Sequence, residues 1–223
     1  MGFRRAGLAI AAGVLALALG ACVNPFQPAT PESPTGKGVT ENFATPDLLL
    51  QTMSDAISTK GTSGRNAYYD VLADSTGTPG MPAFYAFHFP AVVDAWRLST
   101  QRDPPNPWDI RLEKLFYDYL IGLLPTFTYT FVWAPDNSSP VDQYDPTAGT
   151  ALYHRYYELQ ATSGSINKTI AIGYADLYMQ KVNGRWWLYR WEDRVNPPDG
   201  VNPTDPDRLS MGRRRLDSTT AGP

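Results

Sequence analysis

The sequence predicts an α+β domain in which helices come first and pack on one face of a mainly antiparallel sheet. Apolar residues recur at helical spacing early in the chain, as at Leu49, Met53 and Ile57. After Pro125 the spacing changes to two, and aromatic side chains alternate with Thr or Val over residues 127–133. With 43% hydrophobic and 13% aromatic residues in 223, the chain can bury a sizeable core. Helices followed by a run of strands are typical of the α+β class.

The helical half has readable start and stop signals. Residues 45–47 are Thr-Pro-Asp, which supply an N-cap, a proline for the first turn and an acid. Glycines within residues 61–64 end this run, and a second short helix carries Tyr68. Residues 83–89 are predicted as a short strand. The pair at residues 106–107, Asn-Pro, is predicted to cap the strongest helix, whose apolar face is Trp108, Leu112, Leu115, Phe116, Tyr119 and Leu120.

Three further strands follow the alternating aromatic run. They are predicted over residues 151–160, 168–181 and 185–193, all rich in aromatic residues. Asn183 and Gly184 lie between the last two strands, and both residue types tolerate positive φ. The sequence therefore predicts a hairpin turn at this pair.

The N-terminus resembles the signal segment of a bacterial lipoprotein. Arg4 and Arg5 precede an uncharged stretch over residues 6–20, which is short for a membrane span of about 20 residues but suits a signal peptide. The sequence Leu-Gly-Ala-Cys then ends at Cys22, the only cysteine of the chain. This is similar to a lipobox, in which the cysteine is acylated with diacylglycerol and palmitate-type chains. An ordinary signal peptide with an incidental Cys22, or a short anchor helix, is the alternative.

The lipobox implies a protein of the cell envelope that is attached to a membrane through the lipid on Cys22. Val23, in place of an acid, points by analogy to the outer membrane, facing the periplasm, in a diderm bacterium. The predicted organisation is a signal peptide over residues 1–21 and a Pro-rich lipidated tether over residues 22–45. A single domain over residues 46–194 follows, and residues 195–223 are predicted as a Pro-rich linker and a flexible basic tail.

The body of the chain resembles the nuclear transport factor 2-like superfamily, also described as cystatin-like or SnoaL-like. The resemblance is carried by the early Thr-Pro-Asp-Leu helix, by Tyr-Ala-Asp-Leu over residues 174–177, and by a Gly-x-Trp-x-Leu ending over residues 184–188. It implies a curved sheet wrapped as a cone around helices. The superfamily includes isomerases, dehydratases and non-catalytic binding proteins, and many members dimerise through the sheet. No Asp–His pair matches a catalytic position of that family, and residues 91–124 exceed its usual third helix.

Strand alternation places a carboxylate, an imidazole and phenols where they can converge at the mouth of the cone. Arg190 is expected on the same face as Trp186 and Leu188. The alternative is that these polar groups are ordinary pairs across the strand ladder. The candidate ligand-binding residues are Tyr129, His154, Tyr174, Asp176 and Arg190.

The composition argues against several classes of function. A formal charge of −3 gives no basic patch for nucleic acid. One Cys and two His argue against a metal centre, and no phosphate-binding loop or nucleophile elbow occurs, so no cofactor is expected. The expected function is a non-catalytic module that binds a small apolar molecule, a second copy or an envelope protein. A lyase-like or isomerase-like enzyme that uses a carboxylate in the cone pocket is the alternative.

Overall fold

The computed structural model describes residues 38–74, 86–88, 100, 105, 107–137, 140–194 and 210–220. All of them belong to one compact unit, Lys37–Pro223. Cys22, the signal segment, most of the tether and the Pro-rich segment over 195–209 lie outside the described residues. The predicted domain boundaries therefore stay predictions.

Two N-terminal helices form where the sequence predicts them. Helix α2 spans Pro46–Thr59, and the Thr45 side chain caps it by accepting a hydrogen bond from the backbone N–H of Leu48. Helix α3 spans Gly61–Val71. The glycines thus open the second helix. Gly64 is required there because a Cβ at this position would lie 2.4 Å from the carbonyl oxygen of Ala56 in α2.

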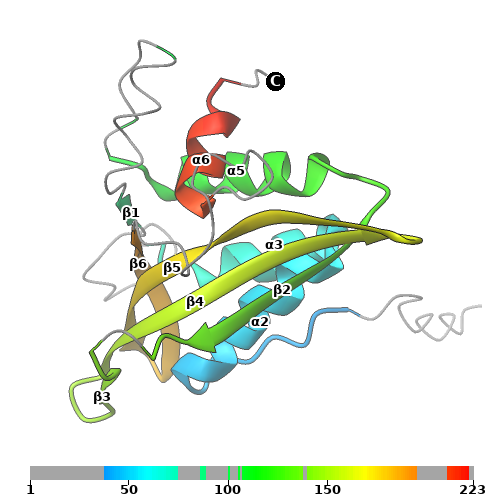
Figure 1. Cartoon of the computed structure of the whole chain (residues 1–223). Helices are drawn as coiled ribbons and strands as arrows, with labels where there is room; N and C mark the ends of the chain where they lie inside the picture. Colours follow the sequence, from blue (N-terminus) through cyan, green and yellow to red (C-terminus); the bar gives the residue numbers. More distant parts are fainter. Residues whose placement is uncertain are drawn as a thin grey trace, which may run out of the picture. The chain divides into compact units, whose positions relative to one another are not determined.

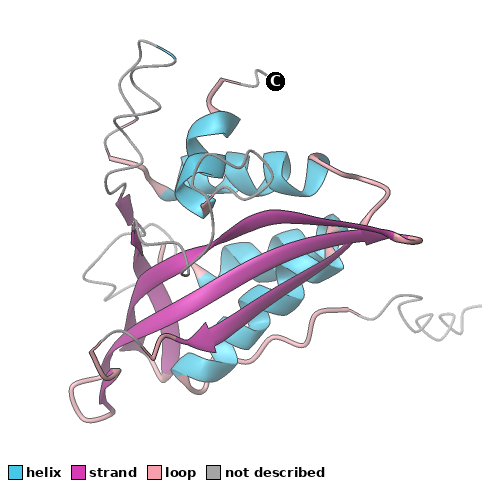
Figure 2. Cartoon of the chain, in the orientation of Figure 1, coloured by secondary structure: helices cyan, strands magenta, loops and turns pink. Residues whose placement is uncertain are grey.

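The sheet has six strands and is mainly antiparallel. Among the strands that the structure describes, the path is β1-β6-β5-β4-β2, with β3 paired to β4, and β1 pairs in parallel with β6. Figure 2 shows β4 and β5 as long, curved strands. The predicted α+β arrangement, with helices packed on a curved, mainly antiparallel sheet, is confirmed. The strand bounds are β1 Ala86–His88, β2 Thr128–Pro135, β3 Gln143–Asp145, β4 Thr150–Ser163, β5 Ile166–Val182 and β6 Arg185–Arg194.

The turn between β5 and β6 falls at the predicted dipeptide. Asn183 has φ 54° and Gly184 has φ 80°, so both occupy the left-handed region that this pair tolerates. The hairpin prediction is confirmed.

The third predicted helix starts later than expected. Helix α5 spans Ile110–Gly122, and its N-cap is Asp109, whose carboxylate accepts from the backbone N–H of Leu112 at 2.9 Å. Trp108 precedes the helix and forms an isolated bridge with Phe87 of β1. The prediction of a cap at residues 106–107 is wrong because the helix begins at Ile110 and Asp109 caps it.

The C-terminal residues do not form the expected flexible tail. Helix α6 spans Met211–Ser218, and Ser210 caps it by accepting from the backbone N–H of Arg213. Figure 1 shows α6 beside α5. The helix is mostly polar, and Met211 and Leu216 are its two buried apolar side chains. A buried arginine, Arg215, pairs with Glu113 of α5.

Candidate functional site

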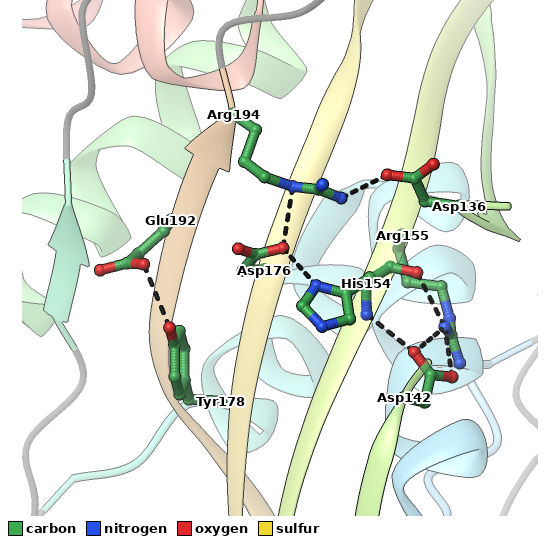
Figure 3. Close-up of polar contacts among 8 residues, drawn as sticks. All are labelled: Asp136, Asp142, His154, Arg155, Asp176, Tyr178, Glu192 and Arg194. Atoms are coloured by element: carbon green, nitrogen blue, oxygen red, sulfur yellow. Dashed lines mark hydrogen bonds and ion pairs between the residues drawn. The ribbon is translucent and has the colours of Figure 1, made fainter. Parts of the chain in front are cut away.

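The two faces of the sheet differ in what covers them. On the helix face, Tyr157, Leu159 and Trp191 are fully buried beneath the helices. In the view of Figure 3 the described helices lie behind the sheet, and the labelled polar side chains lie in front. We call the front side the outer face and define it by Leu152, His154, Tyr156, Glu158, Tyr174, Asp176, Tyr178, Trp187, Tyr189, Arg190, Glu192 and Arg194.

A β-bulge brings Arg190 to the outer face. The β5–β6 register shifts between Tyr178 and Met179, which pair with Arg190 and Leu188, so Tyr189 is the extra residue. Arg190 therefore does not share a face with Trp186 and Leu188, as alternation predicts. The expectation is wrong because one inserted residue reverses the facing of the rest of the strand.

His154 and Asp176 form the centre of the outer face. They stand directly opposite each other in the β4–β5 ladder, and Nδ1 of His154 lies 2.7 Å from Oδ1 of Asp176. The same Oδ1 lies 2.8 Å from Nε of Arg194, whose Nη2 donates to Asp136 at 2.5 Å. Figure 3 shows this chain of contacts, which joins β4, β5, β6 and the residue that follows β2. Two carboxylates thus flank one guanidinium and one imidazole.

The far ring nitrogen of His154 has no hydrogen-bond partner in the described part of the chain. Nε2 is buried, and only 7% of the side chain is exposed. If Nδ1 carries the proton toward Asp176, Nε2 presents a lone pair to an incoming donor. A buried polar atom without a partner costs about 1–3 kcal/mol, so among the described residues Nε2 of His154 is a destabilising feature of this arrangement.

Asp142 fixes the strand beside this pair. Its carboxylate accepts from the backbone N–H of His154 at 2.9 Å and from Nη1 of Arg155 at 2.7 Å. Figure 3 shows Asp142 between the two residues. From the sequence, an acid in a loop, such as Asp142, is expected to be exposed to solvent. Here it orients His154 through the backbone.

A second polar group lies next to the first on the outer face. The hydroxyl of Tyr178 donates to Glu192 at 3.2 Å, Arg190 pairs with the same carboxylate, and the Arg190 guanidinium lies 4.8 Å from the centre of the Tyr178 ring. Burial, and then the Glu192 charge, raise the pKa of Tyr178. Tyr178 therefore stays a hydroxyl donor at neutral pH.

Four of the five predicted site residues share the outer face, and the fifth does not. Tyr174 packs edge-on against Tyr156 with ring centres 5.7 Å apart, beside the pair that Asp176 and His154 form. Arg190 lies one ladder step away, opposite Tyr178.

Tyr129 lies on the helix face and is 2% exposed. Its hydroxyl donates to the carbonyl of Leu120 and accepts from the backbone N–H of Leu124, at 3.0 and 3.1 Å. Burial raises the pKa of Tyr129. These contacts tie the end of α5 to β2, so the structure does not bring Tyr129 together with the other four candidates.

A buried polar cluster on the helix face escaped the sequence reasoning. Glu113 of α5 and Arg215 of α6 pair with both side chains fully buried. The available signal was Glu113 itself, which shares a helical stripe with Phe116, Tyr117 and Leu120. A carboxylate on an apolar stripe indicates a buried partner.

Asp193 is a second buried carboxylate on the helix face. It accepts from the hydroxyl of Tyr157 at 3.1 Å, from Nε1 of Trp191 at 2.8 Å and from the backbone N–H of Gly212 at 2.5 Å. Burial raises the pKa of Asp193, while Arg215 and these donors oppose the rise. Three donors fasten the start of α6 to the sheet through one carboxylate.

One groove on the outer side has the mixed lining that small ligands favour. It has a volume of about 460 Å³ and lies among β3, β4, β5 and β6. Tyr144, Tyr178 and Tyr189 line it, together with the polar side chains of Gln143 and Thr150. Within the described ranges, no group of three or more His, Cys, Asp or Glu side chains is placed to hold a metal ion.

No family model and no curated protein matches this chain. Among solved structures, a protein of unknown function from Mycobacterium tuberculosis shares 12% identity over 78% of this chain and 86% of that one, with a TM-score of 0.48. A protein of unknown function with a cystatin-like fold from Nostoc punctiforme shares 12% identity over 67% and 87%, with a TM-score of 0.37. A candidate scytalone dehydratase from Novosphingobium aromaticivorans shares 11% over 70% and 91%, with a TM-score of 0.43.

At these identities and TM-scores the likenesses carry no information about activity, and the site has to be judged from its own geometry. In the described part of the chain, no helix combines the length and apolar character that crossing a membrane requires.

Proposed function

We propose that this protein is a lipid-anchored lipoprotein of the cell envelope whose domain binds a partner without catalysis. The support for anchoring is the lipobox ending at Cys22, followed by the Pro-rich tether. Each buried CH₂ of an acyl chain contributes about 0.8 kcal/mol, so two or more chains hold a protein stably at a membrane. The tether keeps the domain near its partners at high effective concentration.

The proposed binding surface is the outer face, and its composition is the observation that carries the proposal. Tyr, Trp and Arg are enriched at protein interfaces, whereas Lys is depleted. The outer face as defined above holds four Tyr, one Trp and two Arg, and no Lys.

The proposed occupant is a second copy of this chain. A twofold interface brings the same surface from both copies together, so it needs charges of both signs within one patch. Arg190 and Glu192 lie side by side, and Asp176 lies beside Arg194, so a rotated copy can exchange these pairs.

Sedimentation of the purified chain tests this pairing. Arg190→Glu places two like charges beside each other, so it should shift the protein toward monomer by more than tenfold in dissociation constant, since each 1.4 kcal/mol is tenfold. The double variant Arg190→Glu/Glu192→Arg restores both signs and should recover the dimer. Leu115→Glu, at a position 57% exposed on α5, is the matched control and should sediment as the wild type does. A wild type that stays monomeric at every concentration contradicts the second-copy proposal.

A small apolar or amphipathic ligand is the second candidate partner. The groove beside Tyr144, Tyr178 and Tyr189 favours it, because aromatic rings and polar side chains line it together. Native mass spectrometry of the purified protein should then show a retained molecule that Tyr144→Ala releases. If the wild-type protein shows only the mass of the polypeptide, with no retained molecule, the small-ligand candidate is excluded.

A proton-transfer enzyme of the lyase or isomerase type is the remaining alternative. The His154–Asp176 geometry favours it, because a carboxylate that orients an imidazole is how general bases are built. Arg194 shares the same carboxylate oxygen, which ties Asp176 to a structural role. Turnover of a small carbonyl compound that disappears in Asp176→Asn would establish the enzyme and overturn the non-catalytic proposal.

A further inference from the structure

Arg215 occupies a site whose walls come from other parts of the chain. Its Nε lies 2.7 Å from Oε2 of Glu113, and its Nη2 lies 2.5 Å from Oε1. Two parallel hydrogen bonds of this kind match the planar fork of a guanidinium to a carboxylate. Both side chains are fully buried.

Aromatic rings surround the guanidinium beyond the carboxylate. Its central carbon lies 3.9 Å from the ring centre of Phe87, 4.4 Å from Trp191 and 4.6 Å from Phe116. A cation near aromatic ring centres is stabilised, most strongly where water is excluded. The combination of one carboxylate and three rings selects a flat organic cation.

The carboxylate keeps its position without help from α6. The hydroxyl of Tyr68 in α3 donates to Oε1 of Glu113 at 2.5 Å, and Nε1 of Trp108 donates to Oε2 at 2.8 Å. Glu113 is thus held from two sides by residues outside α6. The site is preorganised, and only its occupant belongs to α6.

Helix α6 is a separable element. It has eight residues, which is too short for a stable helix on its own, so its structure depends on docking. Its apolar anchors are Met211 and Leu216. Hydrogen bonds from Arg215 to Glu113, from Gly212 to Asp193, from Met211 to the Tyr157 hydroxyl and from Arg214 to the carbonyl of Ile170 also hold it to the domain. Short elements near a chain terminus open at a lower free energy than the whole fold.

We propose that the site formed by Glu113, Phe87, Phe116 and Trp191 binds a guanidinium-bearing or amidinium-bearing ligand, and that Arg215 is its tethered occupant. Ligand and α6 then compete for one site, and the ligand displaces α6. A purely stabilising role would not require an ion pair, because well-packed apolar residues serve equally well or better in a buried position.

Chemical rescue tests the site, with ethylguanidinium at millimolar concentration as the probe. In the full-length protein in detergent, Arg215→Ala should lower Tm, and ethylguanidinium should raise it again by a few degrees. The rescue should be absent in Arg215→Ala/Glu113→Gln. It should also be absent with ethylammonium, which carries the positive charge but lacks the planar set of N–H donors of a guanidinium. Arg214→Ala, whose Nε contacts the carbonyl of Ile170, is the matched control and should show no rescue. Equal effects of ethylguanidinium on Arg215→Ala and Arg214→Ala overturn the proposal.

Hydrogen exchange in the unaltered protein tests the competition. Ethylguanidinium should accelerate exchange of the α6 amides over residues 211–218 while the amides of β4 and β5 stay protected. The unaltered protein should bind ethylguanidinium with an apparent affinity about 100-fold weaker than that of Arg215→Ala if α6 is open about 1% of the time. This measurement needs no variant, so it decides the proposal even if Arg215→Ala does not fold. Unchanged α6 exchange at every probe concentration overturns the displacement.

Discussion

Asp176 stands directly opposite His154 in the β4–β5 ladder, and its carboxylate receives both the imidazole and the guanidinium of Arg194. One carboxylate therefore links β4, β5 and β6 on the outer face. With 18% of its side chain exposed, Asp176 interacts in partly dehydrated surroundings, where charge pairs are stronger than at an open surface. This arrangement fixes the positions of the groups that the proposed partner would meet.

Asp176→Asn should destabilise the domain by about 2 kcal/mol, because it leaves Arg194 and His154 without their shared charge. Urea unfolding followed by tryptophan fluorescence measures the change. Asp118→Asn is the matched control, since it breaks an ion pair with Arg65 in which both side chains are more than 40% exposed. Its cost should stay below about 1 kcal/mol. Equal costs for the two variants would show that Asp176 is no more than a surface partner.

Gly64→Ala should destabilise the protein by about 1–3 kcal/mol, because the new Cβ would approach the Ala56 carbonyl at 2.4 Å and push α3 from α2. Gly122→Ala is the control at the end of α5, where nothing lies within 4 Å of an added Cβ. That variant should be neutral or slightly stabilising. Thermal unfolding of both variants gives the comparison, and a neutral Gly64→Ala would contradict the close helix contact.

Asp193 should make stability depend on pH. Burial raises its pKa in the folded protein above that of the unfolded chain, so the folded state holds the proton to higher pH. The free energy of unfolding from this group therefore falls as pH rises through the raised pKa, and increases as pH is lowered. Relative to Asp193→Asn, the wild type should gain stability as pH is lowered from neutral toward the ordinary pKa of an aspartate, about 4. A difference in Tm that is constant over this range contradicts the shift.

Cys22→Ser should release the protein from membranes and abolish its labelling by a fatty-acid analogue. Fractionation of cells with detection in the soluble and membrane fractions measures both. Membrane association that persists without label would show instead that residues 6–20 act as an anchor helix.

Much of the fold could be predicted because its signals are local. Thr45 caps α2 and Asn183-Gly184 turns the last hairpin, as residue type alone indicates. The positions that failed depend on contacts between distant segments. The bulge at Tyr189 moves the Arg190 side chain to the opposite face of the sheet, and no pattern in the sequence of β6 marks an inserted residue. Helix α6 forms because Glu113, about a hundred residues earlier, needs a buried cation.

The candidate site was predictable in part for the same reason. His154 and Asp176 fall on one face by alternation, and their register follows from the turns on either side. Tyr129 was misplaced because alternation gives the period of a strand without saying which of its two faces meets the helices. Asp136 and Asp142 lie in loops, where no periodicity exists to predict contacts with Arg194 and Arg155.

Photo-crosslinking in living cells tests the outer-face interface most directly. A photoreactive amino acid at Tyr156, on the outer face, should give a product with twice the mass of the chain, and it should contain only this protein. The same group at Leu115, which is exposed on α5, should give none. A double-mass product from Leu115 but not from Tyr156, or no double-mass product from either position, would contradict pairing through the outer face.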